Sequence, residues 1–115
     1  MSAAFAEGAR AFDEGRYFEA HEYWEDDWRI EPSPSRKTLL QGLVQVAAAL
    51  HKHRDKGALE PAKSLFAKAL EKLDRCDETP EFPGLRRFVG ETRAYATALS
   101  GDTDVPAPPR VQLRA

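Results

Sequence analysis

A histidine and a glutamate one helical turn apart are the residues best placed to do chemistry in this chain. His21 and Glu25 lie four positions apart in the segment YFEAHEYWEDDW, and this spacing puts both side chains on one side of a helix. Projection at about 100° per residue places Trp24 and Trp28 beside them, so we expect the indole rings to shield the pair from water. A polar pair shielded in this way needs a hydrogen-bond partner or a ligand.

Two kinds of explanation fit the pair. In the structural one, His21 donates a hydrogen bond to Glu25 or to a backbone carbonyl, and the pair locks its helix against the next. In the functional one, the pair lies in a polar pocket that binds a divalent metal or a small ligand, or Glu25 serves as the base of a metal-assisted hydrolase. A metal needs further ligands, and the only other histidines are His51 and His53. If their helix packs beside the first, His21, Glu25 and His51 form a two-histidine, one-carboxylate set.

The helix that carries these histidines also supplies two amides. In RKTLLQGLVQVAAALHKHRDK, Gln41 and Gln45 lie one turn apart beside a broad apolar arc, where they would bond to the locked pair or line the same pocket. The projection places His51 near the centre of the arc and His53 toward its edge, which favours His51 as the inward residue. The sequence HEYWE is not the zinc-protease motif, because Glu25 stands where that motif requires its second histidine.

Five helices are needed to position these residues. Gly15 is expected as a left-handed cap after the first helix, Ser35 as the N-cap of the third, and Gly57 as its end. Pro61 fits the first turn of the fourth helix. The predicted helices cover residues 3–14, 17–30, 36–56, 61–73 and 85–99.

The fold class predicted from this pattern is all-α. No window alternates with period two over the length of a strand. The piece FDEGRYFEAHEYW has the small and aromatic residues of a tetratricopeptide-like turn, which favours two antiparallel helical hairpins and a closing fifth helix. We expect one domain over residues 1–100, followed by a proline-rich tail over 101–115 that is flexible or draped on the surface.

Composition narrows the function classes. A chain of 115 residues suits one domain, and 17 basic against 19 acidic residues give no general attraction to nucleic acid or to anionic membranes. Cys76 is the only cysteine, so no intramolecular disulfide forms. No stretch approaches 18 uninterrupted apolar residues, and the first residues lack the pattern of a secretory leader. We therefore expect a cytoplasmic protein with no nucleic-acid or membrane partner. Its partners are unknown, and a helical interaction unit that forms a homo-oligomer is the alternative to the pocket.

The motifs resemble a known family. His21, Glu25 and Trp28, together with the stretch LLQGLVQ, resemble the bacterial and archaeal domain of unknown function 309, whose signature is His-x-x-x-Glu-x-x-Trp on one helix and a Leu-x-Gly-Leu-Ile-Gln-like stretch on the next. The resemblance covers about residues 5 to 75. It implies a small all-helical domain and a metal suggested for the His and Glu, but no established reaction. By its distance to Gly57, the family's later histidine matches His53, so both His51 and His53 stay candidates.

Overall fold

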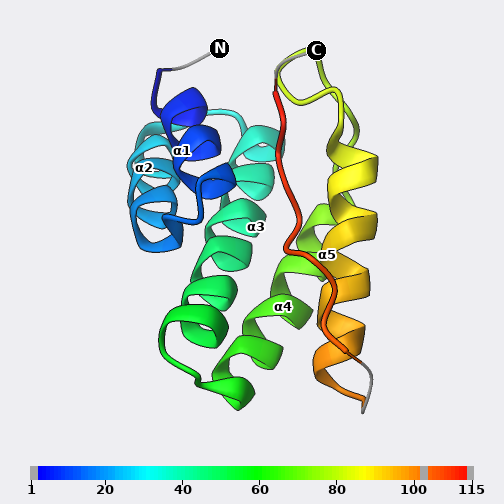
Figure 1. Ribbon diagram of the computed structural model, residues 1–115. Helices are drawn as coiled ribbons and strands as arrows, with labels where there is room; N and C mark the ends of the chain where they lie inside the picture. The colour runs from blue at the N-terminus through cyan, green and yellow to red at the C-terminus, as the bar shows by residue number, and fades with distance from the viewer. Residues whose placement is uncertain (1–2, 102–103, 114–115) are drawn as a thin grey trace.

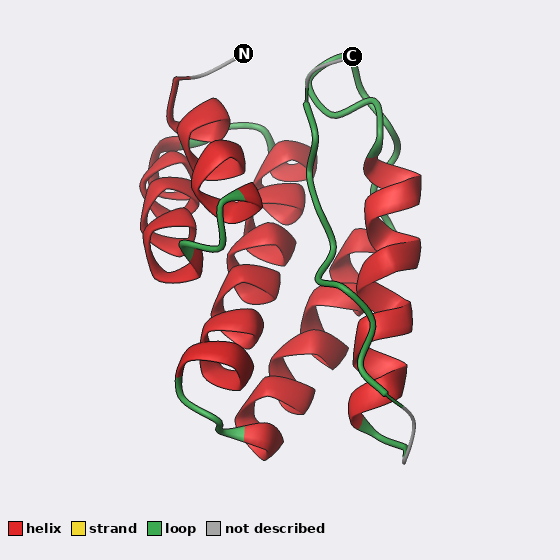
Figure 2. Ribbon diagram, in the orientation of Figure 1, coloured by secondary structure: helices red, strands yellow, loops and turns green. Residues whose placement is uncertain are grey.

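The described part of the chain folds into five α-helices. The computed structural model describes residues 3–101 and 104–113, and within these ranges it contains no strand (Figure 1, Figure 2). None of the described helices is long and apolar enough to span a membrane. The all-α prediction is therefore confirmed. The elements are α1 (Ala3–Asp13), α2 (Tyr17–Ile30), α3 (Pro34–Leu50), the π-helical turn η1 (His51–Asp55), α4 (Leu59–Leu73) and α5 (Leu85–Leu99).

The helix ends follow from local chemistry, with one correction. Gly15 has φ = 83°, its N–H donates to Phe12 O, and the next N–H reaches back to Ala11 O, so the expected left-handed cap forms. The N-cap predicted at Ser35 is wrong. Ser33 takes this role by accepting from the Arg36 N–H, and Pro34 occupies the first helical position, where its missing N–H costs nothing.

Consecutive helices pack on one another. In Figure 1, α1 and α2 lie on one side of α3, while α4 and α5 lie on the other. The ring of Phe12 contacts Trp24 at 5.6 Å between centroids and Phe88 of α5 at the same separation, so the fifth helix closes the core opened by the first two. The hairpin arrangement agrees with these contacts. Most of the α3 side chains that face its neighbours are fully buried.

The third helix does not continue to Gly57 as a regular α-helix. After Leu50 the chain winds into the wider π turn η1, and Gly57 follows with φ = 65°. The Ala58 N–H then donates to Lys52 O at 2.8 Å. Extra-wide turns of this kind are rare and occur often at functional sites. The turn carries both histidines of the predicted site, His51 and His53.

The C-terminal segment has no helix, but it is bound to the helices. Residues 104–113 run back along α5, between this helix and α1 (Figure 1). The side chain of Val111 is fully buried and belongs to the main core. The described part of the predicted tail is thus draped over the helices. Its flexibility, and the boundary between a domain at 1–100 and a tail at 101–115, stay predictions.

Candidate functional site

The seam between α2 and α3 contains the first and last signature residues, His21 and Trp28. His21 and Trp28 lie seven residues apart on α2, which is close to two helical turns, so both point to the same side. That side faces α3, because the Lys37 Nζ lies 4.6 Å from the centre of the Trp28 ring. Farther along the seam, Phe18 contacts His51 with 5.3 Å between ring centroids. Helix α2 therefore presents an aromatic edge to α3.

Two ring nitrogens in this seam are buried without a partner. Within the described part of the chain, neither His21 Nδ1 nor Trp28 Nε1 has a hydrogen-bond partner, and neither is accessible to solvent. A buried polar atom left in this state costs about 1–3 kcal/mol. From the helical rise, the two residues lie about 10 Å apart along the axis of α2. His21 Nδ1 is thus shielded from water, and the His21 ring stacks on Phe18, with 6.0 Å between centroids.

Glu25 points away from His21. Its carboxylate accepts a hydrogen bond from Arg29 at 3.1 Å, and its side chain is 35% exposed. It lines an open depression of about 360 Å³ on the outer, acidic side of α2, to which His21 does not contribute. The described contacts include no bond between Glu25 and His21. The predicted locking pair is therefore not formed, and Glu25 is not shielded by indole rings.

Trp24 belongs to the core, not to a pocket. It is fully buried, and its Nε1–H donates to Phe5 O at 3.1 Å. The backbone of Gly8 lies directly against the indole, so that a Cβ at this position would collide with the ring. This tryptophan therefore fixes α1 on α2. The two tryptophans of the motif differ in kind, since one indole N–H is paired and the other is not.

No described contact joins Gln41 or Gln45 to His21, so their place in a shared pocket stays a prediction. Lys37, Val44 and His51 recur every seven residues on the arc of α3 that faces α2, and Gln45 lies about 100° around the helix from Val44. Its Oε1 is a third buried atom with no partner among the described residues. Gln41 lies closer to the arc and is partly buried, with no side-chain hydrogen bond among the described contacts.

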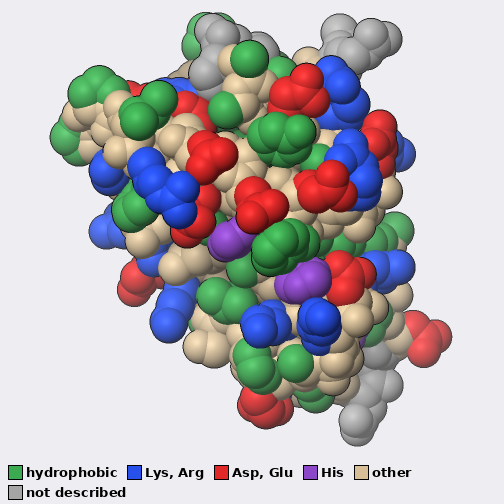
Figure 3. Space-filling view, turned by 90° about the vertical axis from the view of Figure 1, so that its left-hand side faces the viewer, with side chains coloured by type: hydrophobic (Ala, Val, Ile, Leu, Met, Phe, Trp, Pro, Cys, Tyr) green, Lys and Arg blue, Asp and Glu red, His purple; other side chains and the backbone are tan. Residues whose placement is uncertain are grey.

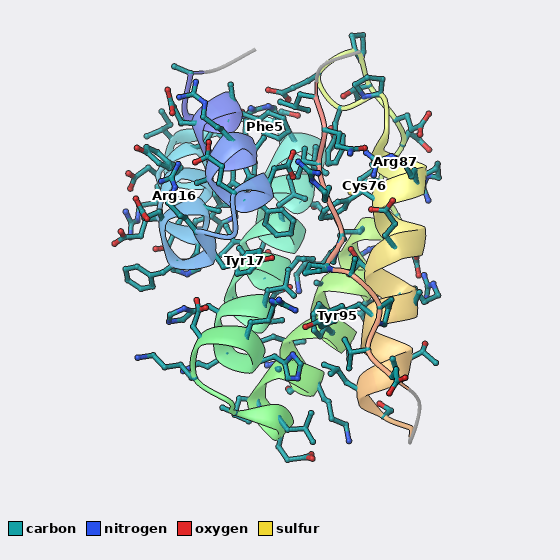
Figure 4. The ribbon with its side chains drawn as sticks, viewed as in Figure 1. Phe5, Arg16, Tyr17, Cys76, Arg87 and Tyr95 are labelled. Carbon is teal, nitrogen blue, oxygen red and sulfur yellow. The ribbon has the colours of Figure 1, made fainter. Side chains whose placement is uncertain are left out.

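The two later histidines lie in different surroundings. His51 Nδ1 is 2.8 Å from the Asp55 carboxylate, and the Phe18 ring contacts both His51 and His21. Figure 3 shows this face, with two histidine side chains separated by a hydrophobic one. His53 Nδ1 instead lies 2.7 Å from the hydroxyl of Tyr95. Figure 4 shows Tyr95 reaching from α5 toward the bundle interior.

These positions do not form a metal centre. Among residues 3–101 and 104–113, no three or more His, Cys, Asp or Glu side chains are close enough together to hold a metal ion. Glu25 is paired with Arg29, and His53 with Tyr95. A phenyl ring contacts both of the remaining histidines. The donor set expected for His21, Glu25, His51 and His53 therefore does not fit one ion in this arrangement.

An ionic cluster that sequence reasoning missed lies near one end of the seam. The guanidinium of Arg36 bonds to three carboxylates, at 2.9 Å to Asp27, 2.6 Å to Glu31 and 2.7 Å to Glu81. Asp27 is buried although the adjacent Asp26 is exposed. Helical projection puts Asp27 on the edge of the apolar face. No local pattern shows that its counter-ion, Arg36, lies nine residues away, or that Glu81 joins the cluster from 45 residues beyond Arg36.

Charge pairing and burial shift the pKa values around the bundle. Hydrogen bonds to Glu81 and then Asp27 raise the pKa of Arg36, while the Ser33 N–H and then Arg36 lower the pKa of Glu31. Burial raises the pKa of Tyr17, and likewise that of the Cys76 thiol. A hydrogen bond to Tyr95 raises the pKa of Arg54. Pairing thus favours the charged forms of Arg36 and Glu31, while burial favours the thiol form of Cys76.

Comparison with known proteins identifies relatives but no activity. Residues 5–65 match the family model described as Domain of unknown function (DUF309), a range that runs from α1 into the first half of α4. The chain is 27% identical over 106 residues to an uncharacterized protein of Aquifex aeolicus (strain VF5), covering 92% of this chain and 30% of that protein. It is 36% identical over 69 residues to the uncharacterized protein YpuF of Bacillus subtilis (strain 168), covering 60% and 39%. The chain therefore spans less than two fifths of either relative. No solved structure matches it.

Proposed function

The chain belongs to the family Domain of unknown function (DUF309), and from that premise we propose that it is a binding module whose ligand occupies the seam between α2 and α3. The observation that supports this is the pair of buried, unpaired ring nitrogens, His21 Nδ1 and Trp28 Nε1. Both lie in the matched part of the chain. Polar groups that a fold leaves unpaired are concentrated at functional sites.

The chemistry of the seam limits the ligand. The indole N–H of Trp28 can only donate, so it needs an acceptor on the ligand. His21 Nδ1 either donates or accepts, depending on its tautomer. A ligand that satisfies both atoms carries polar groups about 10 Å apart, since seven helical residues separate them. Phe18 beside His21 offers a ring for stacking. We infer an elongated organic ligand with polar groups near both ends, acting in the cytoplasm.

A thermal-unfolding screen tests this function. Purified full-length chain is heated with members of a set of small amides, carboxylic acids and nucleosides, and with Zn²⁺ and Mn²⁺ as metal controls. A ligand that binds only the folded chain raises the melting temperature by mass action. We expect at least one organic compound to do so, with the rise lost in Trp28→Phe. If every compound changes the melting temperature of the wild type and of Trp28→Phe by the same amount, the proposal fails.

A second candidate function is protein–protein interaction. Helix α2 exposes three large apolar side chains, Phe18 at 51%, Tyr23 at 39% and Ile30 at 81%. All three belong to one helix, so α2 offers a partner an apolar contact surface. Sedimentation of wild type and of Ile30→Glu tests this: an assembly that the substitution disrupts supports the interaction unit, and an unchanging monomer without partners counts against it.

The hydrolase alternative gains nothing from this geometry, because Glu25 pairs with Arg29 outside the seam.

A further inference from the structure

The C-terminal segment is held mainly through its backbone. The Glu91 carboxylate accepts from the Arg110 N–H at 3.1 Å. The two oxygens of Asp13 accept from the N–H groups of Val111 and Gln112 at 2.6 and 2.8 Å. Arg87 donates to the carbonyls of Arg110 and Val111, both at 2.8 Å. Five consecutive backbone groups are thus paired with three side chains from α1 and α5.

Only part of the segment's sequence matters for this contact. The Val111 side chain is fully buried between the helices, and Pro109 is also buried. Arg110 and Gln112 are exposed on either side. A groove that pairs with backbone groups and encloses alternate side chains recognises an extended peptide, as in strand-addition complexes. The groove therefore requires only three successive residues of a peptide: a proline, then any residue, then a β-branched aliphatic residue.

The groove lies partly outside the part of the chain that the family model matches, since α5 and the C-terminal segment follow residue 65, while Asp13 lies within the match. Figure 4 shows Arg87 on α5 beside the C-terminal segment. Glu91 also accepts from Arg87 at 3.1 Å, which fixes the guanidinium toward the segment. Asp13, at the end of α1, faces it from the opposite wall. The walls are therefore set by helices that pack on the core, not by the segment itself.

We propose that this groove is a peptide-binding site, filled in the structure by the chain's own residues 109–113, which the same segment of a second copy can fill instead. Exchange of an identical element between copies preserves every contact and is a low-cost route to a dimer. Pro106, Pro108 and Pro109 keep the segment extended, which reduces the entropy lost on binding. Residues 104–107 are exposed and form the connection that would have to reopen.

Fluorescence anisotropy with a labelled peptide of residues 104–115 tests the proposal. The receptor is the full-length Val111→Asp chain, because a carboxylate cannot be buried among the core side chains and its own segment should leave the groove. We expect saturable binding of the native-sequence peptide. A peptide that itself carries Val111→Asp should bind at least tenfold more weakly. Wild-type chain should also bind the native peptide at least tenfold more weakly, because its own segment competes.

The receptor's groove is checked by a second change. Adding Arg87→Gln to the Val111→Asp chain removes the donor to two carbonyls, and we expect at least a tenfold loss of peptide affinity. Circular dichroism establishes that each receptor is folded, with Val111→Ala as the milder replacement. No binding to a folded receptor overturns the proposal, as does equal binding by wild type. If neither receptor folds without Val111 in place, the segment is a permanent part of the core, and this too overturns it.

Discussion

At the scale of single residues, the two tryptophans of the motif separate structure from function. Trp24 pairs its Nε1–H with Phe5 O inside the core, and its loss would affect packing. Trp28 keeps its Nε1 buried and unpaired within the described contacts, and Lys37 covers its ring. His21 shares the unpaired state at Nδ1. A stability cost at two signature residues on the same side of α2 is expected of a binding site whose ligand supplies the missing hydrogen bonds.

The first prediction concerns His21→Leu. If Nδ1 is buried and unpaired in the free chain, a side chain of similar size without polar atoms should raise the free energy of unfolding by about 1 kcal/mol. If His21 instead locks α2 to α3 through a hydrogen bond, the same change should lower it. Urea unfolding of both proteins measures the sign. Trp24→Phe is the matched control. Its free energy of unfolding should fall by about 2 kcal/mol, because the substitution removes the hydrogen bond to Phe5 O and leaves a cavity.

The sequence located His21 and Trp28 because helical spacing alone puts both on the side of α2 that meets α3. It did not show that Glu25 turns outward, since Arg29 competes for that carboxylate one turn later. Nor did it place Gln45, whose surroundings depend on how α3 is rotated against two neighbours at once. Burial of Asp27 was equally beyond reach, because its counter-ion Arg36 comes from another helix.

At the scale of the elements, the Arg36 cluster joins α2, the start of α3 and the loop before α5. Asp27, Glu31 and Glu81 converge on one guanidinium that also lies over the Phe5 ring at 5.8 Å. Asp27 is nearly inaccessible to water, so its carboxylate relies on bonds such as the one from Arg36. The cluster therefore ties the end of α2 to the start of α3 and to the loop before α5.

The second prediction follows from that dependence. Arg36→Met keeps most of the side-chain volume but removes the guanidinium that bonds to the buried Asp27 carboxylate, and we expect a loss of about 3 kcal/mol or more in unfolding free energy. Arg29→Met is the control, because its two ion pairs are exposed and should contribute less than about 1 kcal/mol. Equal losses of unfolding free energy in Arg36→Met and Arg29→Met would show that the cluster does not anchor α3.

The third prediction is the pH dependence of Glu31. The folded pKa of this carboxylate lies below its ordinary value of 4.5, so its stabilising contribution is complete above that value and is lost as the pH falls through the lowered one. Wild type should therefore melt higher than Glu31→Gln at neutral pH, and the gap should close in acid. Melting curves between about pH 3 and pH 7 measure this. A gap that does not change with pH would contradict it.

The fourth prediction compares two helical glycines. Gly8→Ala forces a methyl group into the Trp24 indole, and overpacking of this kind should cost about 1–3 kcal/mol. Gly90→Ala on α5 meets nothing within 4 Å, and it should add about 0.5–1 kcal/mol by restricting the unfolded chain. Thermal unfolding of the two variants should shift in opposite directions. A shift in the same direction would mean that α1 does not pack on Trp24 as described.

At the scale of the whole molecule, the helical periodicity predicted all five helices, and the extents of α2 and α5 agree with prediction. The reason is that long amphipathic segments bounded by Gly and Pro are local signals. The π turn η1 and the docking of Val111 were beyond sequence reasoning, since each depends on contacts with residues far along the chain. The chain covers less than two fifths of its relatives, so its module is one part of those longer proteins.

The hydrogen-bond state of the two indole N–H groups, measured by proton–nitrogen NMR, tests the central claim most directly. Trp24 serves as an internal standard, because its N–H donates to Phe5 O. We predict that the Trp28 signal shows the shift and temperature dependence of an unbonded N–H in the free chain, and moves toward the bonded state when a ligand fills the seam. A Trp28 signal already in the bonded state in the free chain, and unmoved by every compound in the set, would contradict the account.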